Sequence, residues 1–145
     1  MPPVRRNALV ELLWKAHRFI YRLSGGRIGA RLMQWRVILL TTTGRKTDEP
    51  RQVSLNALLD GKRTVVIASN AGEPQHPQWF LNLRANPSAI VQHGRERFRA
   101  ISREAEGEER ERLWRRIVEV DRSYAEYQRR TTRRIALVIL EPGSQ

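Results

Sequence analysis

The sequence predicts an α+β fold in which about six mainly antiparallel strands form a curved or barrel-like sheet with flanking helices. Short runs rich in Val, Ile, Leu and Thr recur along the chain. The dipeptides Asp60-Gly61 and Gly94-Arg95 each separate two such runs, as the tight turns of antiparallel hairpins do. Apolar residues take up helical spacing at the start of the chain, near its middle and late in it.

The size and composition suit a single domain covering residues 1–145. A chain of 145 residues can bury one modest core, and 40% of its residues are hydrophobic, which separates it from disordered sequences. No internal repeat, low-complexity tract or linker interrupts the sequence. We therefore expect one folded core over residues 36–142, preceded by a helix over residues 5–23.

The chain is strongly basic, with 27 Lys and Arg against 15 Asp and Glu and a formal net charge of +12. This balance favours polyanions, anionic membrane surfaces or acidic small molecules as partners. Cysteine is absent, which excludes disulfides and thiolate chemistry and suits a reducing cytoplasm. No secretory signal is visible and the apolar runs are too short to span a bilayer, so we expect a cytoplasmic protein.

Residues 5–23 are predicted to form a basic amphipathic helix, because apolar residues recur there at helical spacing while Arg and Lys occupy other faces. Two interpretations of this helix are open. It packs on the body of the domain, or it makes peripheral contact with an anionic membrane, for which Trp14 and Phe19 are suited. The Ser24-Gly25-Gly26 segment ends it.

The remaining elements follow from runs of β-forming residues, turn residues and helical periodicity. In chain order we expect strands at 36–43, 51–59 and 63–69, a loop at 70–77, a short helix from Trp79 to about Asn86, strands at 89–93 and 96–102, a helix at 107–120 and a final buried strand at 135–140.

Several common sites are missing from the sequence. The three histidines, His17, His76 and His93, lack metal-ligand spacing, so no metal site is predicted. There is no dinucleotide-binding Gly-x-Gly-x-x-Gly, no Walker-type loop and no conventional nucleophile signature.

The turn that follows the first predicted strand combines the hydroxyls of Thr41–Thr43 with Gly44 and the cations Arg45, Lys46 and Arg51. A glycine lets the backbone turn and approach a ligand closely, while hydroxyls, exposed N–H groups and cations complement phosphate or carboxylate. The turn is either an anion cradle or a solvated loop. Its spacing alone does not decide between them.

Three motifs in order carry a resemblance to a known family: LLTTTGRKTDEPR at 39–51, VIASNAG at 66–72 and HPQWFLNLRANP at 76–87. Together with the sequence up to residue 142, they closely resemble the deazaflavin-dependent nitroreductase family. The resemblance implies a split β-barrel, of the type that also binds FMN, and coenzyme F-420, a deazaflavin with a phosphate and an oligoglutamate tail. Its reduced form would deliver a hydride to an electron-poor small molecule such as a quinone, enone or nitroaromatic.

The resemblance also implies roles for individual residues. The cofactor's phosphate and acidic tail would be held by Arg45, Lys46, Thr47 and Arg51. The next contact segment would consist of Ile67, Ala68, Ser69 and Asn70, and the deazaflavin ring would lie against Gln78, Trp79, Phe80, Leu81 and Asn82.

Tyr124 and Tyr127 match family positions that close over the substrate, where a phenol can orient or protonate the acceptor and exclude water. From the residues alone, the favoured explanation is a pair of amphipathic helix residues at positions i and i+3. Asn56, Asn70 and Asp121 depart from the family pattern, which argues against assigning nitroimidazole reduction.

Two alternatives come from other classes. One is a split-barrel protein that binds FMN or heme, or that merely carries F-420. The other is a basic nucleic-acid-binding module, which is disfavoured because the cations are scattered and no helix-turn-helix, zinc-finger or RNA-binding signature accompanies them. The sequence leaves the oligomeric state open.

Overall fold

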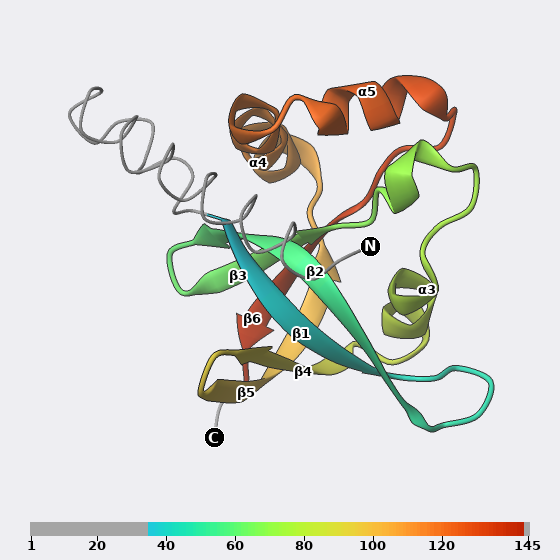
Figure 1. The fold of residues 1–145 in the computed structure, drawn as a ribbon, viewed down its shortest axis with the longest axis vertical. Coiled ribbons are helices and arrows are strands. Elements are labelled where there is room, and N and C mark those ends of the chain that lie inside the picture. The colour runs from blue at the N-terminus through green and yellow to red at the C-terminus, as the bar shows by residue number, and fades with distance from the viewer. Residues whose placement is uncertain (1–34, 144–145) are drawn as a thin grey trace, which may run out of the picture. The chain divides into compact units, whose positions relative to one another are not determined.

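The computed structural model describes residues 35–143, which belong to one compact unit. The helix predicted at 5–23 lies outside the described residues. The strands and helices, shown in Figure 1, are β1 (Trp35–Thr43), β2 (Pro50–Asp60), β3 (Arg63–Ile67), a 3-10 turn η1 (Asn70–Gly72), α3 (Gln78–Ala85), β4 (Ser88–His93), β5 (Glu96–Glu104), α4 (Gly107–Val120), α5 (Ser123–Arg130) and β6 (Leu137–Pro142).

The strands form a closed barrel in the order β1-β2-β3-β6-β5-β4, and every strand pair in it is antiparallel. Both predicted hairpins are present, with Asp60 paired to Arg63 and His93 paired to Glu96. Gly61 and Gly94 have φ values of 64° and 58°, the left-handed backbone that tight hairpin turns require. The predicted α+β architecture is confirmed.

Some element boundaries differ from the predictions. β3 ends at Ile67 rather than at residue 69, because the backbone turns into left-handed conformations at Asn70 and Ala71. The last strand runs from Leu137 to Pro142 instead of 135–140. Helix α5 was not predicted as a separate element.

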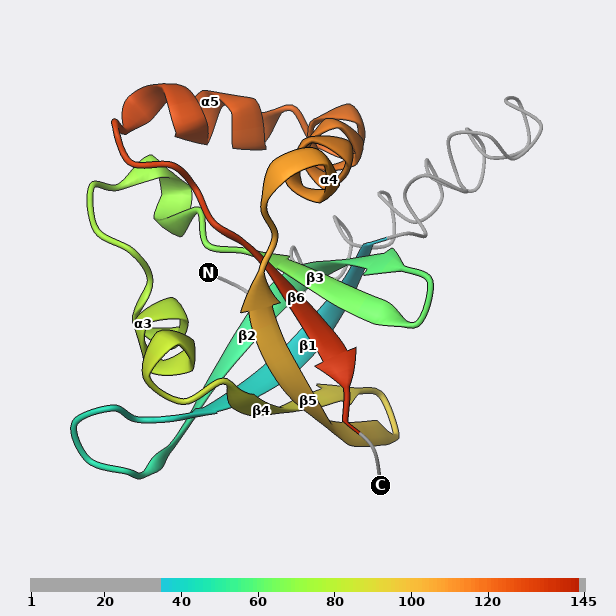
Figure 2. The same cartoon turned by 180° about the vertical axis from the view of Figure 1, so that it is seen from behind.

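The first core fills the barrel. In β1, Ile38 and Leu40 alternate with more exposed neighbours and point inward, as a strand with one buried face requires. Helix α3 contributes its apolar face to the same cluster through Trp79, Phe80 and Leu83. Figure 2 shows α3 beside the barrel, close to the long turn that joins β1 to β2.

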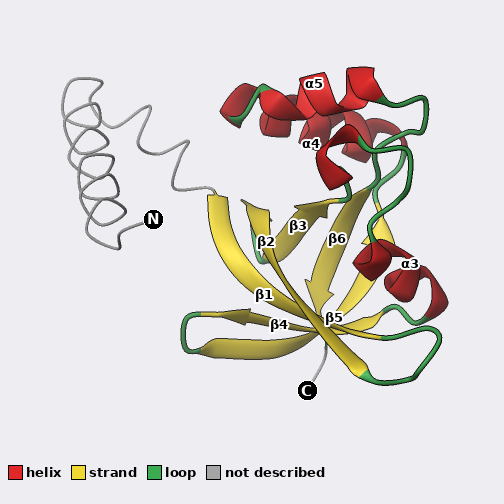
Figure 3. Cartoon of the chain, turned by 45° about the vertical axis from the view of Figure 1, so that its right-hand side comes forward, coloured by secondary structure: helices red, strands yellow, loops and turns green. Residues whose placement is uncertain are grey.

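The second core lies outside the barrel wall, between the β3–β6 pair and the helices α4 and α5 (Figure 3). Leu113 and Ile117 of α4 are fully buried there against Leu137 and Ile139 of β6. Because the other β6 side chains face the barrel interior, this strand is apolar on both faces. This double burial explains why its sequence reads as a continuous apolar run.

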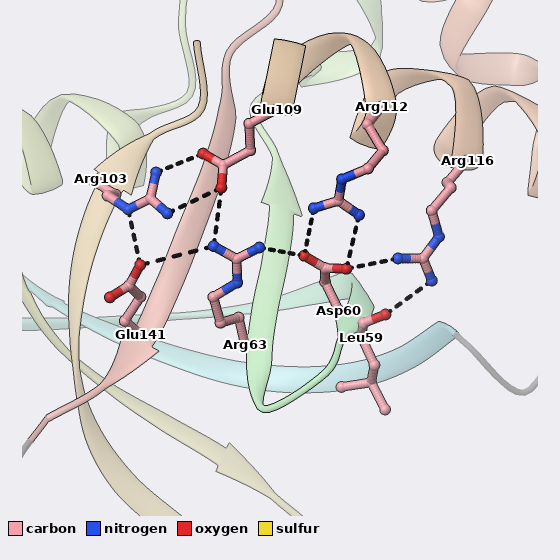
Figure 4. Close-up of polar contacts among 8 residues, drawn as sticks. All are labelled: Leu59, Asp60, Arg63, Arg103, Glu109, Arg112, Arg116 and Glu141. Atoms are coloured by element: carbon pink, nitrogen blue, oxygen red, sulfur yellow. Dashed lines mark hydrogen bonds and ion pairs between the residues drawn. The ribbon is translucent and has the colours of Figure 1, made fainter. Parts of the chain in front are cut away.

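An ion-pair network joins the β2–β3 hairpin to α4, β5 and β6 (Figure 4). The Asp60 carboxylate accepts hydrogen bonds from Arg63, Arg112 and Arg116 at 2.5 to 3.0 Å. Glu109 bridges Arg63 and Arg103, which also contacts Glu141. The network fixes α4 against the barrel. Its guanidinium groups hold the pKa of Asp60 well below its usual range and lower the pKa of Glu109 to about 2.

Candidate functional site

A cavity of about 760 Å³ lies between the β1–β2 turn, the start of β2, the loop before α3 and the first turn of α3. It is lined by Thr42, Gly44, Arg45, Lys46, Thr47, Arg51, Gln52, Val53, Asn70, Gln75, His76, Pro77, Gln78, Trp79 and Asn82. Three of these residues are cations and none is a carboxylate. The cavity is therefore suited to an anionic ligand.

The β1–β2 turn is closed by backbone hydrogen bonds at Gly44. The Gly44 amide donates to the Glu49 carbonyl and the Asp48 amide donates to the Gly44 carbonyl, both at 2.8 Å. A Cβ at position 44 would lie 2.9 Å from Thr47 Oγ1 and 3.1 Å from the Glu49 carbonyl oxygen. The φ of Gly44 is not in the left-handed region, so backbone conformation does not require a glycine here. The close approach of these two oxygen atoms does.

The buried Asn82 side chain connects this turn to α3. Its carboxamide oxygen accepts hydrogen bonds from the backbone N–H of Arg45 at 3.2 Å and from Arg45 Nη1 at 2.9 Å. Its Nδ2 group donates to the buried hydroxyl of Thr42 at 3.2 Å. One amide thus satisfies polar groups of β1 and the turn, and it fixes the Arg45 guanidinium at the cavity wall.

The first turn of α3 completes this wall. Arg45 Nη2 donates to Gln78 Oε1 at 2.8 Å, and the Trp79 side chain is buried while still lining the cavity. No side chain caps the N-terminus at Pro77. The N–H groups in the first turn of α3 therefore lack a capping side chain, and they form the positive end of the helix dipole.

The loop between β3 and α3 supplies the opposite part of the lining. Three successive residues, Asn70, Ala71 and Gly72, have φ values of 45°, 54° and 79°. The Asn70 side chain closes the loop by donating to the Gln75 carbonyl at 3.0 Å. The loop thereby brings Asn70, Gln75 and His76 to the cavity.

His76 was not predicted as a site residue. Its Nδ1 atom is buried and has no hydrogen-bond partner among the described residues, and its ring lies 4.9 Å from that of Phe80. Burial lowers the pKa of His76, and the nearby cations Arg133 and Arg84 act in the same direction. The imidazole is therefore neutral at pH 7. Its place as the first residue of the HPQWFLNLRANP motif was the signal that sequence reasoning left unused.

The structure brings eight of the predicted cofactor-binding residues to the cavity lining: Arg45, Lys46, Thr47, Arg51, Asn70, Gln78, Trp79 and Asn82. The other five do not line it. Ile67, Ala68 and Phe80 are buried in the two cores, and Ser69 and Leu81 are half-buried.

Tyr124 and Tyr127, the predicted catalytic pair, lie on α5 and are not part of this lining. Tyr124 stacks on Trp35 with ring centroids 5.7 Å apart, and it meets Tyr127 edge-on at 5.7 Å. Burial and the Asp121 carboxylate raise the pKa of Tyr124, while a hydrogen bond with Asn56 acts in the opposite direction. Asn56, one of the departures from the family pattern, thus contacts the phenol itself.

Within residues 35–143, no three His, Asp or Glu side chains gather closely enough to hold a metal ion. No helix in the same range has the length and apolar content needed to cross a bilayer.

A small antiparallel barrel with a cationic cavity beside helix α3 is the architecture of a split-barrel protein, and the charge of the cavity suits an anionic ligand. Residues 13–142 match the family described as F420H(2)-dependent quinone reductase. The chain belongs to this family. It is an oxidoreductase that uses coenzyme F-420 and passes electrons to a small-molecule acceptor of the quinone class. The resemblance seen in the sequence is confirmed.

Individual relatives agree with this assignment. The chain is 38% identical over 141 residues, 94% of each chain, to an F420H(2)-dependent quinone reductase of Mycobacterium tuberculosis (strain ATCC 25618 / H37Rv). It is 42% identical to a solved F420-H2 dependent reductase, with a TM-score of 0.67 and coverage of 72% of this chain and 93% of that one. A structure described as a domain-swapped dimer is 36% identical, with a TM-score of 0.68 and coverage of 90% and 99%.

Proposed function

We propose that the cavity binds the phosphate and acidic tail of coenzyme F-420 and that the aromatic cluster on α5 receives the quinone. The observation that carries the first part is the composition of the cavity, which has three cations and no carboxylate among its lining residues. Phosphate and carboxylate groups form their strongest hydrogen bonds with such cations.

The donor groups present fit this ligand. Arg45 is fixed by Asn82 and Gln78 at 2.8 to 2.9 Å, so little rotamer entropy is lost when an anion binds it. Lys46 is exposed and Arg51 is 56% exposed, which suits them to attract the acidic tail from solvent. When bound in reduced form, the cofactor supplies the hydride, and the protein contributes binding and alignment.

Trp79 gives the cavity an aromatic wall, against which a planar ring can pack. The imidazole of His76 also lines the cavity, and its Nδ1 atom has no hydrogen-bond partner within residues 35–143. We infer that the deazaflavin ring lies toward these two residues and that the acidic tail extends along the β1–β2 turn.

The acceptor site is inferred from Tyr124, Tyr127 and Trp35, whose rings pack against one another. Because burial raises the pKa of Tyr124, its phenol stays protonated up to a higher pH than an exposed tyrosine does. It can then donate a hydrogen bond to a quinone oxygen as negative charge develops there. The surrounding rings exclude water from that contact.

Equilibrium titration with F-420 and with FMN, followed by fluorescence, tests the cavity assignment. We expect tighter binding of F-420. Lys46→Ala and Arg51→Ala should each weaken F-420 binding a few-fold, and the double variant about tenfold, because exposed contacts are partly screened by water. Lys62→Ala is the matched control, since Lys62 is an exposed cation on the β2–β3 hairpin and is not part of the cavity lining.

Two results would contradict the proposal: equal or tighter binding of FMN, and an unchanged F-420 affinity in the double variant with its fold intact. Loss of affinity in Lys62→Ala to the same degree would show that only overall charge matters.

We further propose that enones and nitroaromatics can serve as acceptors beside quinones, to be tested as a substrate panel with reduced F-420. A cytoplasmic location with peripheral contact between residues 5–23 and an anionic membrane is also proposed, on the sequence pattern alone. Co-sedimentation of the full chain with anionic and with neutral vesicles tests that contact. Equal recovery with both would reject it.

A further inference from the structure

We infer that Arg133 is a positioning residue for the cofactor cavity, acting through the backbone of the loop that begins at Ala68. This inference rests on the proposed function. Arg133 follows α5 in the chain and is not part of the cavity lining. It therefore acts on the site only through the groups that it holds.

The three nitrogen groups of its guanidinium each donate to a different backbone carbonyl. Nη1 donates to Ala68 at 3.0 Å, Nη2 to Ser69 at 2.8 Å and Nε to Glu73 at 3.0 Å. These carbonyls bracket the segment from the end of β3 to the residue after η1. One side chain thus ties together both ends of the tight turn.

The turn needs such a restraint because of its backbone conformation. Asn70 and Ala71 both have positive φ values although neither is glycine, and such conformations persist only where their surroundings hold them. The internal bonds are few: the Gly72 amide donates to Ser69 and the Glu73 amide to Asn70, at 2.9 and 3.0 Å. The Arg133 bonds add charge-assisted contacts from outside the turn.

Arg133 is itself anchored to the end of α5. Gln128 Nε2 donates to the Arg133 carbonyl at 2.8 Å, and Gln128 Oε1 accepts from the Ile135 amide at 2.9 Å. In addition, a Cβ on Gly72 would lie 2.7 Å from the Tyr127 carbonyl oxygen, so the turn and α5 are in direct contact. The guanidinium therefore joins the loop that reaches the cavity to the helix that carries the tyrosine pair.

The loop has a direct role at the cavity, because Asn70 and Gln75 both belong to its lining. If the turn loosens, these groups and the segment leading into α3 lose their fixed positions. A lysine cannot replace the arginine, since one ammonium cannot place three donors on three carbonyls in the geometry of a planar fork.

The test compares Arg133→Lys and Arg133→Ala with the parent, measuring F-420 affinity by titration and backbone amide exchange by mass spectrometry. We expect about tenfold weaker F-420 binding in both variants and faster exchange at residues 69–73, with the barrel strands unchanged. A low, non-denaturing concentration of guanidinium ion should partly restore affinity in Arg133→Ala.

Arg112→Ala is the matched control, because it removes an arginine from the ion-pair network on Asp60 and leaves the cavity lining untouched. It should lower stability without changing F-420 affinity or exchange at 69–73. If the Arg133 variants lose only stability, like this control, the inference is overturned.

Failure of the proposed function has a different signature. In that case the parent itself would not bind F-420, whereas the exchange measurement would still decide whether Arg133 orders the loop. Unchanged exchange at 69–73 in Arg133→Ala overturns the inference whatever the parent binds.

Discussion

The side chain of Asn82 holds Arg45 by two hydrogen bonds to the same carboxamide oxygen, one from the backbone N–H at 3.2 Å and one from Nη1 at 2.9 Å. The amide is 4% exposed and lies on α3, whereas Arg45 lies in the β1–β2 turn. This relationship gives the turn a fixed shape before any ligand arrives.

Replacing Asn82 with Ala removes both acceptor contacts and leaves the buried Thr42 hydroxyl without its donor. We expect the free energy of unfolding to fall by about 1–3 kcal/mol, measured by urea denaturation, and F-420 affinity to fall with it. Asn82→Asp keeps the acceptor but adds a negative charge beside the cavity, so it should lose F-420 affinity by repulsion of the acidic tail. Parent-like affinity in both variants would show that Arg45 does not need this support.

The barrel was predictable because its determinants are local. Both hairpins depend on a glycine in a two-residue turn, and helix 107–120 has a clear apolar stripe that the structure reproduces with the same bounds. Helix α5 was not predicted as an element, since eight residues rich in polar side chains give no strong pattern. It is held by tertiary contacts, through Tyr124 in the second core and the backbone contact with Gly72.

The site, like the fold, has parts that the local sequence pattern indicates and parts that depend on contacts between distant residues. The sequence singles out the motif around Gly44 and the segment from Gln78 to Asn82 as candidate binding segments, and the structure places parts of both on one cavity. Arg133 could not be found this way. It lies 60 to 65 residues from the carbonyls it holds. Because its partners are backbone atoms, the identity of the side chains in the loop does not indicate the contact.

The ion-pair network predicts a specific acid sensitivity. In the unfolded chain Glu109 takes up a proton near its ordinary pKa of 4.5, whereas in the folded protein its pKa is lowered to about 2 by Arg103 and Arg63. Its contribution to stability is therefore present above about pH 4.5 and is lost as the pH falls toward 2. The pKa of Asp60 is lowered in the same direction, by Arg112 and Arg63.

Asp60→Asn tests this by removing the carboxylate that three arginines share. We expect a loss of about 1–3 kcal/mol at pH 7 and a shallower fall in stability below about pH 3.8, the ordinary pKa of Asp60, than in the parent. The measurement is the urea midpoint at a series of pH values. Parallel pH profiles for the variant and the parent would exclude Asp60 as a source of the acid sensitivity.

Gly72→Ala should destabilise the cavity loop more than an ordinary glycine substitution. Position 72 combines a φ of +79° with a Cβ that would lie 2.7 Å from the Tyr127 carbonyl oxygen. Gly61→Ala is the control, because its φ of +64° is similar but nothing lies within 4 Å of the added Cβ.

For Gly61→Ala we expect about 1 kcal/mol of lost stability, from backbone conformation alone. Gly72→Ala should lose more and should also weaken F-420 binding, measured by thermal unfolding with and without F-420. Equal losses in the two variants would mean that the contact with α5 relaxes without cost.

Tyr124 provides the sharpest test of the acceptor site, because two substitutions separate its hydroxyl from its ring. Tyr124→Phe keeps the stack on Trp35 and removes the phenol that contacts Asn56, whereas Tyr124→Ala also removes the aromatic wall. If the phenol donates to the quinone oxygen, Phe should lower kcat by about 10- to 100-fold and leave the F-420 affinity nearly unchanged. If Tyr124 acts only as a wall, Phe should match the parent and Ala should raise the KM for quinone.

Steady-state kinetics with reduced F-420 distinguish these outcomes, and Tyr127→Phe shows whether the second phenol can substitute as donor. Parent-like turnover in both Tyr124 variants would remove this residue from the site and place the acceptor elsewhere on the barrel.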